Sequence, residues 1–242
     1  MKNIYIIGAG GFGREVADTV CAINMAAAGA EQPYRIVGFI DEDESKWGTL
    51  INGIEVKGGL DWLRISCTSG GLPTAGRPYA DKPGADTGAT DMRPAEAAHA
   101  VIAIADPKAK RAMAEKLGDL TIWETIIHPT AVVSPHAIIE AGTVIQANAF
   151  VSADAHIGGH CCVNCLSSIG HDAVLGDCVS VMSHCDITGG VRLADDVYVA
   201  TSVAVIPEIS VGKGAFIGAG SVVLKNVDEN TRMLGYPARR IG

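Results

Sequence analysis

A six-residue repeat fills the second half of the chain and restricts the fold more than any other feature. From Ile127 to Val223 the first residue of each successive hexad is Val, Ile or Leu, seventeen times without a break in phase. The fifth positions, from Ala131 to Val227, are nearly all small or β-branched. A sustained hexapeptide period is typical of a parallel β-helix, in which three hexads make one triangular coil. We therefore expect residues 126–242 to form such a coil, followed by a short C-terminal tail.

The first 125 residues have a different pattern, in which short apolar segments alternate with amphipathic ones. KNIYIIGAG, RIVGFID, HAVIAIADP and LTIWETII favour strands, and REVADTVCAINMAA and KAKRAMAEKLGD favour helices. Residues 66–98 are rich in Gly, Ala, Pro, Thr and Asp without an apolar period, which predicts a long inserted loop. We expect residues 1–125 to be a small Rossmann-like α/β domain of about four strands.

The segment GAGGFG at residues 8–13 fits the pattern GxGxxG between an expected strand and an expected helix. Such a turn directs backbone N–H groups and a helix N-terminus at a phosphate. Asp41 ends the next strand, where a ribose-binding acid lies in dinucleotide enzymes. A full NAD-binding fold needs about six strands, so the pattern favours a phosphate or nucleotide-sugar site. An NAD site and a purely structural turn are the alternatives.

The phase of the repeat predicts where His171 lies and which residue is its neighbour in the next coil. It takes the third position of the hexad IGHDAV, which turns it away from the core or places it at a corner. Stacking of coils puts Gly189, which is 18 residues further on, about 5 Å away. Position alone does not favour a catalytic base over a solvated surface imidazole, because four other histidines also lie in the repeat: His136, His156, His160 and His184.

The segment HCCVNC at residues 160–165 raises the question of a metal site. Cys161 and Cys185 fall at inward fifth positions, where cysteine acts as a small hydrophobic residue. His160, Cys178 and Asp196 share one column at 18-residue intervals, which is the arrangement that leaves zinc as an alternative. We expect no metal ion.

Composition argues against several classes of partner and indicates the cellular compartment. A net charge of −8 and a pI near 5.3 argue against nucleic acid and against an anionic membrane surface. The sequence has no apolar run long enough for a transmembrane span, and the run Ile4–Ile7 is too short for a secretion signal. Seven cysteines without disulfide-like spacing suit a reducing compartment. We expect a cytoplasmic protein.

Several longer segments resemble a known family. Three segments of the repeat and tail resemble the hexapeptide-repeat acyltransferases: IGHDAVLGDCV, IPEISVGKGAFIGAGSVV and MLGYPARRIG. Three segments of the first domain restrict the resemblance to one group of these enzymes: IYIIGAGGFGREVAD, VGFIDED and VIAIADPKAKR. Apart from the insertion, the chain is similar to the bacterial sugar acetyltransferases of the sialic acid O-acetyltransferase and UDP-4-amino-sugar N-acetyltransferase type. That resemblance implies a left-handed β-helix, acetyl-CoA as co-substrate, and a homotrimer with active sites between subunits.

The resemblance also implies roles for individual residues. His171 matches the general base, Asp172 its supporting carboxylate, and Gly189 the amide that contacts the thioester carbonyl. Thr201 and Ala219 match backbone positions along the pantetheine arm, and Asn164 matches an amide near the acceptor sugar or, alternatively, stabilises a corner. The positions that match uridine diphosphate contacts are Gly10, Gly11, Phe12, Asp41, Glu42 and Ala105. Phe12 departs from family members that have histidine there.

The leading hypothesis is an acetyl-CoA-dependent N-acetyltransferase acting on a UDP- or dTDP-linked amino sugar, by direct transfer with His171 as base. O-acetylation of sialic acid or another sugar by the same residues is the second reading. A non-catalytic nucleotide-binding assembly module is the third. Arg239 and Arg240 either reach the phosphates of CoA or form a solvated end.

Overall fold

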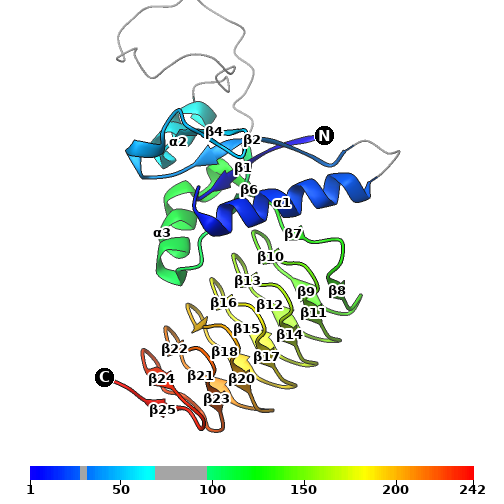
Figure 1. Cartoon of the computed structure of the whole chain (residues 1–242), viewed down its shortest axis with the longest axis vertical. Helices are drawn as coiled ribbons and strands as arrows, with labels where there is room; N and C mark the ends of the chain where they lie inside the picture. Colours follow the sequence, from blue (N-terminus) through cyan, green and yellow to red (C-terminus); the bar gives the residue numbers. More distant parts are fainter. Residues whose placement is uncertain (28–31, 69–96) are drawn as a thin grey trace, which may run out of the picture.

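The computed structural model describes residues 1–27, 32–68 and 97–242. An α/β domain is followed by a parallel β-helix, and the C-terminus lies at the end of the coil remote from that domain (Figure 1). Most of the expected 66–98 loop lies outside the described residues. At its margins, α2 continues to Thr68 and β5 begins at Ala98, so regular structure extends a few residues into the range expected to be loop.

The N-terminal sheet has six strands in the order β3-β4-β2-β1-β5-β6. All neighbouring pairs are parallel except β3 with β4, which form an antiparallel pair. The sheet is larger than the four strands expected, because GTLINGIEVKG contributes two that are too short to show an apolar period. The strands are β1 (Lys2–Ile7), β2 (Tyr34–Ile40), β3 (Leu50–Ile51), β4 (Ile54–Gly58), β5 (Ala98–Ile102) and β6 (Thr121–Trp123).

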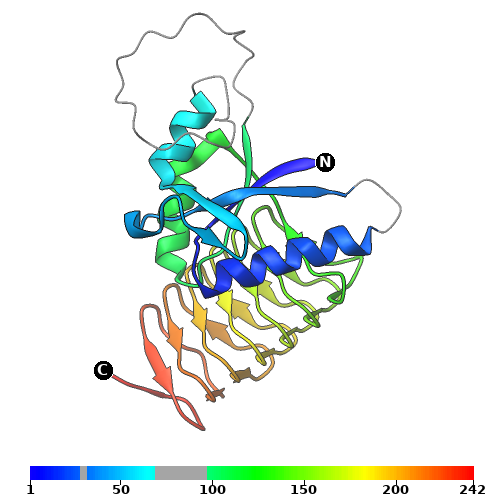
Figure 2. The same ribbon diagram turned by 45° about the horizontal axis from the view of Figure 1, so that its top comes forward.

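Helices cover both surfaces of this sheet. α1 (Gly11–Ala26) packs on one surface, while α2 (Leu60–Thr68) and α3 (Pro107–Leu117) pack on the other. Two short 3-10 helices, η1 (Glu44–Lys46) and η2 (Gly118–Leu120), complete the domain. α1 lies between the sheet and the coil (Figures 1 and 2), because its apolar side shares one buried cluster with β1, β2 and the outer side of the first coils.

The coil contains seventeen two-residue strands, β7 to β23, one for each hexad of the sequence. They stack into three parallel sheets, called here faces I, II and III, and each residue pairs with the one 18 positions on. Face I holds β7 (Ile126–Ile127), β10 (Val144–Ile145), β13 (Cys162–Val163), β16 (Ser180–Val181), β19 (Tyr198–Val199) and β22 (Phe216–Ile217), followed by β24 (Arg232–Leu234) and β25 (Arg239–Arg240).

Faces II and III complete the prism. Face II holds β8 (Val132–Val133), β11 (Phe150–Val151), β14 (Ser168–Ile169), β17 (Asp186–Ile187), β20 (Ala204–Val205) and β23 (Val222–Val223). Face III holds β9 (Ile138–Ile139), β12 (His156–Ile157), β15 (Val174–Leu175), β18 (Arg192–Leu193) and β21 (Ser210–Val211). The corners between faces are named I/II, II/III and III/I.

The inward positions are those that the repeat predicted. Ile169, Ala173 and Leu175 are buried in one cluster that runs through the coil, and so are most of the corresponding residues of the later coils. Those of the first coil, such as Ile127 and Val133, are partly buried against it. The fourth residue of nearly every hexad has a positive φ, as at Asp172 (59°) and Leu166 (59°). This left-handed conformation turns the chain at each corner, and it costs about 1–2 kcal/mol at a residue with a side chain. Inward packing therefore has to offset a repeated backbone cost.

The N-terminal domain is docked on face I. Thr19 on α1 donates a hydrogen bond to Gln146 Oε1 (2.6 Å), and Arg111 on α3 donates to Asp196 Oδ1 (2.7 Å). Glu124, in the link between β6 and β7, is buried and accepts hydrogen bonds from Lys2 Nζ (2.8 Å) and Tyr34 Oη (3.0 Å). The first two contacts hold the domain against one side of the prism, and the Glu124 contacts fix the link to the N-terminal sheet.

Candidate active site

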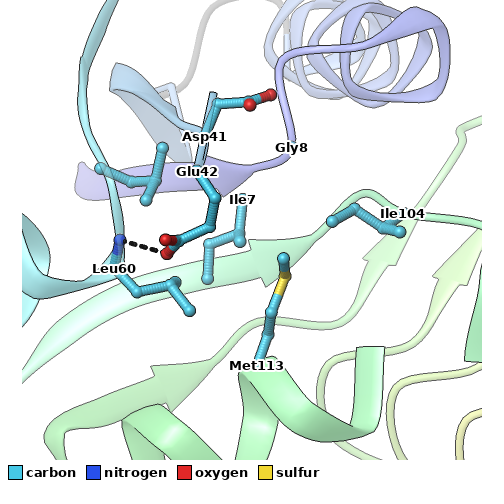
Figure 3. A pocket seen from close by; sticks show the side chains of 8 residues that line it. Ile7, Gly8, Asp41, Glu42, Leu60, Ile104 and Met113 are labelled. Carbon is cyan, nitrogen blue, oxygen red and sulfur yellow. Dashed lines mark hydrogen bonds between the residues drawn. The ribbon is translucent and has the colours of Figure 1, made fainter. Parts of the chain in front are cut away.

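A cavity of about 90 Å³ lies at the carboxyl ends of β1 and β2 (Figure 3). The carboxyl edge of a parallel α/β sheet is where such folds bind ligands. The lining is mostly apolar, with one acidic pair at its rim: Ile7, Gly8, Ile40, Asp41, Glu42, Leu60, Ile104 and Met113. Leu60, Ile104 and Met113 were missed by the sequence analysis, because nothing local marks an apolar residue as lining a cavity.

Asp41 holds the glycine turn. Its Oδ2 accepts hydrogen bonds from the Ala9 amide (2.8 Å) and from Lys46 Nζ (3.0 Å), and its Oδ1 accepts from the Asp43 amide (2.9 Å). Burial opposes ionisation of Asp41, but these hydrogen bonds outweigh it and hold the pKa of the carboxyl below its ordinary value. Figure 3 shows the side chain directed toward the turn at Gly8. Its position makes Asp41 a support of the turn.

The glycines of the turn divide into two kinds. A Cβ on Gly13 would lie 2.0 Å from the Gly8 carbonyl oxygen, and one on Gly8 would lie 2.8 Å from Ala103 O, so both serve close packing. A Cβ on Gly10 would meet nothing within 4 Å, and Gly11 is almost as open. The N-terminus of α1, which begins at Gly11, therefore faces free space and can accept an anion. Phe12, the next residue, packs partly buried against the apolar cluster beneath α1.

Glu42 and Ala105 also have internal partners. Glu42 Oε1 accepts a hydrogen bond from the Leu60 amide at the start of α2 (2.9 Å), drawn as the dashed line in Figure 3. Its other carboxylate oxygen remains at the rim of the cavity. The Ala105 carbonyl accepts a hydrogen bond from Ser180 Oγ on face I (2.6 Å), which ties the loop after β5 to the coil.

His171 lies at corner II/III, between β14 and β15. Its side chain is 70% exposed, and its Nδ1 is 2.7 Å from Asp172 Oδ2. With the Nδ1-protonated tautomer, Nδ1–H donates a hydrogen bond to the Asp172 carboxylate, which leaves Nε2 of the neutral imidazole as the basic nitrogen. The phase of the repeat predicted this outward position.

Gly189 lies directly below the imidazole. A Cβ on Gly189 would be 2.6 Å from His171 Nε2 and 2.7 Å from Cε1, so only glycine leaves room for the ring in this position. The Gly190 amide donates to the His171 carbonyl (2.9 Å), which keeps the two coils in register. The stacking expected from the sequence therefore brings His171 and Gly189 into contact.

Corner II/III also leaves a backbone donor free. At corner III/I, the amides of Gly159 and Asp177 donate to the carboxylates of Asp177 (2.9 Å) and Asp195 (3.1 Å) one coil further on. At corner II/III the residue one coil beyond Gly189 is Pro207, which has no acceptor side chain. The Gly189 amide has no hydrogen-bond acceptor within residues 1–27, 32–68 and 97–242. It is available to an oxyanion.

Asn164, Thr201 and Ala219 lie along corner I/II. Asn164 is 6% exposed, and its Oδ1 accepts a hydrogen bond from the Cys165 amide (2.7 Å), so it also stabilises the corner. Thr201 and Ala219 share one exposed column, and the Thr201 carbonyl accepts from the Gly220 amide (3.0 Å).

Within one chain the predicted residues form three separate groups. The glycine turn with Asp41 and Glu42 lies on the domain docked to face I, and His171 lies at corner II/III, across the prism from that face. Asn164 lies at corner I/II. The body of the coil separates the nucleotide-site candidates from the candidate base, so a single copy does not bring them together.

The Cys/His column has other contacts. His160 packs edge-on against Trp123 (4.7 Å between ring centroids), Cys178 is buried, and Asp196 is paired with Arg111. Burial and the nearby Lys110 lower the pKa of His160. No group of three or more His, Cys, Asp or Glu side chains arranged to hold a metal ion occurs in the described ranges.

Comparison with known proteins agrees with this architecture. Residues 3–68 match the family model described as the PglD N-terminal domain. The N-terminal domain is of the PglD type. Over about three tenths of its length the chain is similar to curated acetyltransferases: 42% identity over 79 residues with serine acetyltransferase of Bacillus pumilus, and 35% over 82 residues with that of Salmonella typhimurium. These matches span 36% and 30% of the relatives' lengths, so the chain matches only about a third of each.

Solved structures match over the whole chain. PerB from Caulobacter crescentus, in complex with CoA and GDP-perosamine, has a TM-score of 0.78 at 23% identity and covers 100% of this chain and 98% of its own. The acetyltransferase domain of PglB from Neisseria gonorrhoeae has a TM-score of 0.77 at 24% identity with complete coverage of both chains. At these identities the likeness shows the fold: a PglD-type α/β domain joined to a hexapeptide-repeat β-helix. Among the described helices, none is both long enough and apolar enough to cross a bilayer.

Proposed function

We propose that the chain is an acetyl-CoA-dependent N-acetyltransferase of a nucleotide-linked amino sugar. The observation that carries this proposal is the geometry at corner II/III, where Asp172 holds His171 Nδ1 and His171 Nε2 lies over Gly189. The similarity of part of the chain to serine acetyltransferases supports acetyl-CoA as the donor. The whole-chain likeness to PerB, whose structure contains CoA and GDP-perosamine, supports the class of acceptor.

The reaction follows from these positions. The amino group of the sugar attacks the thioester carbonyl carbon, and His171 Nε2 takes the proton that the nitrogen loses. The oxygen of the tetrahedral intermediate accepts a hydrogen bond from the Gly189 amide. Collapse of the intermediate breaks the carbon–sulfur bond, and the imidazolium returns the proton to the departing thiolate. Asp172 stabilises the imidazolium between these two steps. No acyl-enzyme is formed.

The spacing of the coil supports a donor extended along corner II/III. Gly189, Pro207 and Lys225 follow His171 in one column at 18-residue steps. Three steps at the usual strand spacing amount to roughly 14 Å, comparable to an extended pantetheine arm. Lys225, Arg239 and Arg240 line a cavity of about 300 Å³ at the end of this column, which would hold the phosphates of acetyl-CoA. Thr201 and Ala219 would contact the arm from corner I/II of a neighbouring copy.

The proposal includes a homotrimer. Closed symmetric assemblies are the common form of soluble oligomers, and the separation of the two half-sites in one chain means that one copy alone does not complete the site. The glycine turn, Asp41, Glu42 and Ala105 of one copy would hold the nucleotide, and His171 of the next would act on the sugar. Asn164 would lie near the acceptor group.

A thiol-release assay tests the proposed function. The wild-type protein is mixed with acetyl-CoA and, in separate reactions, with UDP-, dTDP- and GDP-linked amino sugars and free sialic acid. Thiol release and an acetamido product with a nucleotide-linked amino sugar are expected, together with a loss of at least about 100-fold in His171→Ala. Acetylation of sialic acid alone would favour O-acetylation instead. Unchanged transfer by His171→Ala would overturn the assignment of the base.

A further inference from the structure

Lys110 is a fully buried lysine at the boundary between the two domains. It lies on α3, and its side chain is enclosed between α3 and face I, with 1% of the residue exposed. Its Nζ donates hydrogen bonds to Ser180 Oγ (2.8 Å) and to the Val179 carbonyl (3.1 Å). No carboxylate in the described part of the chain pairs with it. A buried ammonium without a counter-charge is costly, so its position calls for a reason beyond packing.

Lys110 determines where the Ser180 hydroxyl donates its own hydrogen bond. Because the ammonium donates to Ser180 Oγ, the hydroxyl hydrogen is directed elsewhere, and it bonds the Ala105 carbonyl (2.6 Å). Ala105 belongs to the loop between β5 and α3, and its neighbour Ile104 lines the cavity at the glycine turn. The loop beside the proposed nucleotide site is thus hydrogen-bonded to the coil through one hydroxyl.

This contact also orients a backbone donor. In a trans peptide the C=O and N–H point in opposite directions. With the Ala105 carbonyl held toward face I, the Asp106 N–H is directed away from the coil. That N–H has no acceptor within the three described ranges. It is therefore available to a ligand in front of the loop.

Ser180 and His171 lie in the same coil, nine residues apart. Their heights along the coil differ by about half of one strand spacing, roughly 2.4 Å. A threefold axis parallel to the coil leaves heights unchanged, so the loop of one copy and His171 of the next are at nearly the same level. A shift of this loop along the coil would move a bound sugar past the base.

We propose that Lys110 and Ser180 form a positioning pair for acetyl transfer: they orient the Ala105–Asp106 peptide and set the height of the nucleotide-sugar loop opposite His171. This inference rests on the proposed function. Neither side chain touches the reacting atoms. The domain remains docked without this pair through Thr19–Gln146 and Arg111–Asp196, so the pair can be altered while both domains stay in place.

The test compares Lys110→Met, Ser180→Ala and the double variant with Lys108→Met. Lys108 lies two residues earlier on the same helix and is exposed, so its variant controls for loss of a lysine from α3. For each protein, kcat is measured with a saturating nucleotide sugar, and Kd values for the sugar and for CoA are measured by calorimetry. A misplacement of about 1 Å costs up to about 100-fold in rate. We expect kcat to fall 10- to 100-fold in both single variants and the Kd for the sugar to rise less than about tenfold, because only the Asp106 hydrogen bond is weakened. The Kd for CoA should stay unchanged, and Lys108→Met should match the wild type.

The double variant should be no slower than the slower single variant, because both changes release the same peptide. Wild-type kcat in Lys110→Met would overturn the inference, and so would a loss that appears in Kd instead of kcat. A crystal structure of Lys110→Met gives a readout independent of activity: a displaced Ala105 carbonyl is expected, and an unmoved loop would also overturn it. Absence of transfer by the wild-type protein would instead refute the proposed function.

Discussion

Replacement of Gly189 by alanine is the sharpest test of the geometry at corner II/III. The added Cβ would lie 2.6 Å from His171 Nε2, whereas an ordinary contact is 3.4 Å or more, so the ring has to move by about 0.8 Å. Gly189 does not have a positive φ, so alanine fits the backbone. The exposed imidazole can swing outward. The substitution thus displaces the proposed base, His171, and retains the Gly189 amide.

The expected loss follows from the size of this displacement. A shift approaching 1 Å at a reacting group costs about 100-fold, which corresponds to about 2.7 kcal/mol of transition-state stabilisation. The free energy of unfolding should change by less than about 1 kcal/mol, since the inward packing of the coil is untouched. The loss should appear in kcat, with the KM for acetyl-CoA nearly unchanged.

Gly159→Ala is the matched control. Gly159 takes the same third position of its hexad at corner III/I, where an added Cβ would meet its nearest neighbour, Ala141 O, at 3.4 Å. Its kcat should equal that of the wild type. The assay is steady-state acetyl transfer with urea unfolding of each variant. Wild-type kcat in Gly189→Ala, or a crystal structure of that variant with His171 unmoved, would refute the reasoning.

Three further predictions concern stability. Burial opposes ionisation of Glu124, but its hydrogen bonds outweigh burial and lower its pKa from the ordinary 4.5. The ionised carboxylate therefore stabilises the folded state fully above about pH 4.5. This stabilisation is lost as the pH falls through the pKa of the folded state. Urea unfolding of Glu124→Gln should show a loss of about 2–3 kcal/mol at pH 7 and a smaller one at pH 3; an equal loss at both would contradict this account. Burial and the hydrogen bond to Glu124 raise the pKa of Tyr34 to about 12. The free energy of unfolding of the wild type should therefore fall between pH 10 and 12, where Tyr34 ionises more readily in the unfolded chain. An equal fall in Tyr34→Phe would contradict this explanation. Leu166, with a φ of 59° and 52% exposure, should gain about 0.5–1 kcal/mol as Leu166→Asn, because asparagine tolerates this conformation better; unchanged or lower stability in urea would contradict this.

The sequence predicted the coil well because its determinants are local. Each hexad repeats the same choice of inward residue, so the phase alone placed Ile169 inside and His171 outside, and the period placed Gly189 beside His171. The roles of these residues stay predictions, since they depend on resemblance and not on position.

The N-terminal domain was less predictable because its determinants are distant in sequence. Asp41 was expected to contact a nucleotide. In the structure its carboxylate accepts a hydrogen bond from the Ala9 amide, 32 residues away in the sequence. For KAKRAMAEKLGD the sequence predicted a helix, and only the docking of α3 on the coil reveals that Lys110 is buried. No periodicity encodes which face of the coil receives a neighbouring domain.

The unbroken 18-residue coil has a consequence for how such a chain can change length. One extra residue within the repeat would turn every later inward side chain outward, whereas a whole additional coil would preserve the phase of all of them. A coil inserted between Gly189 and Lys225 would increase the distance from the imidazole to the cation-lined cavity by roughly 4.8 Å. Such a chain can therefore lengthen only in whole coils, and the distance between these two features changes in discrete steps.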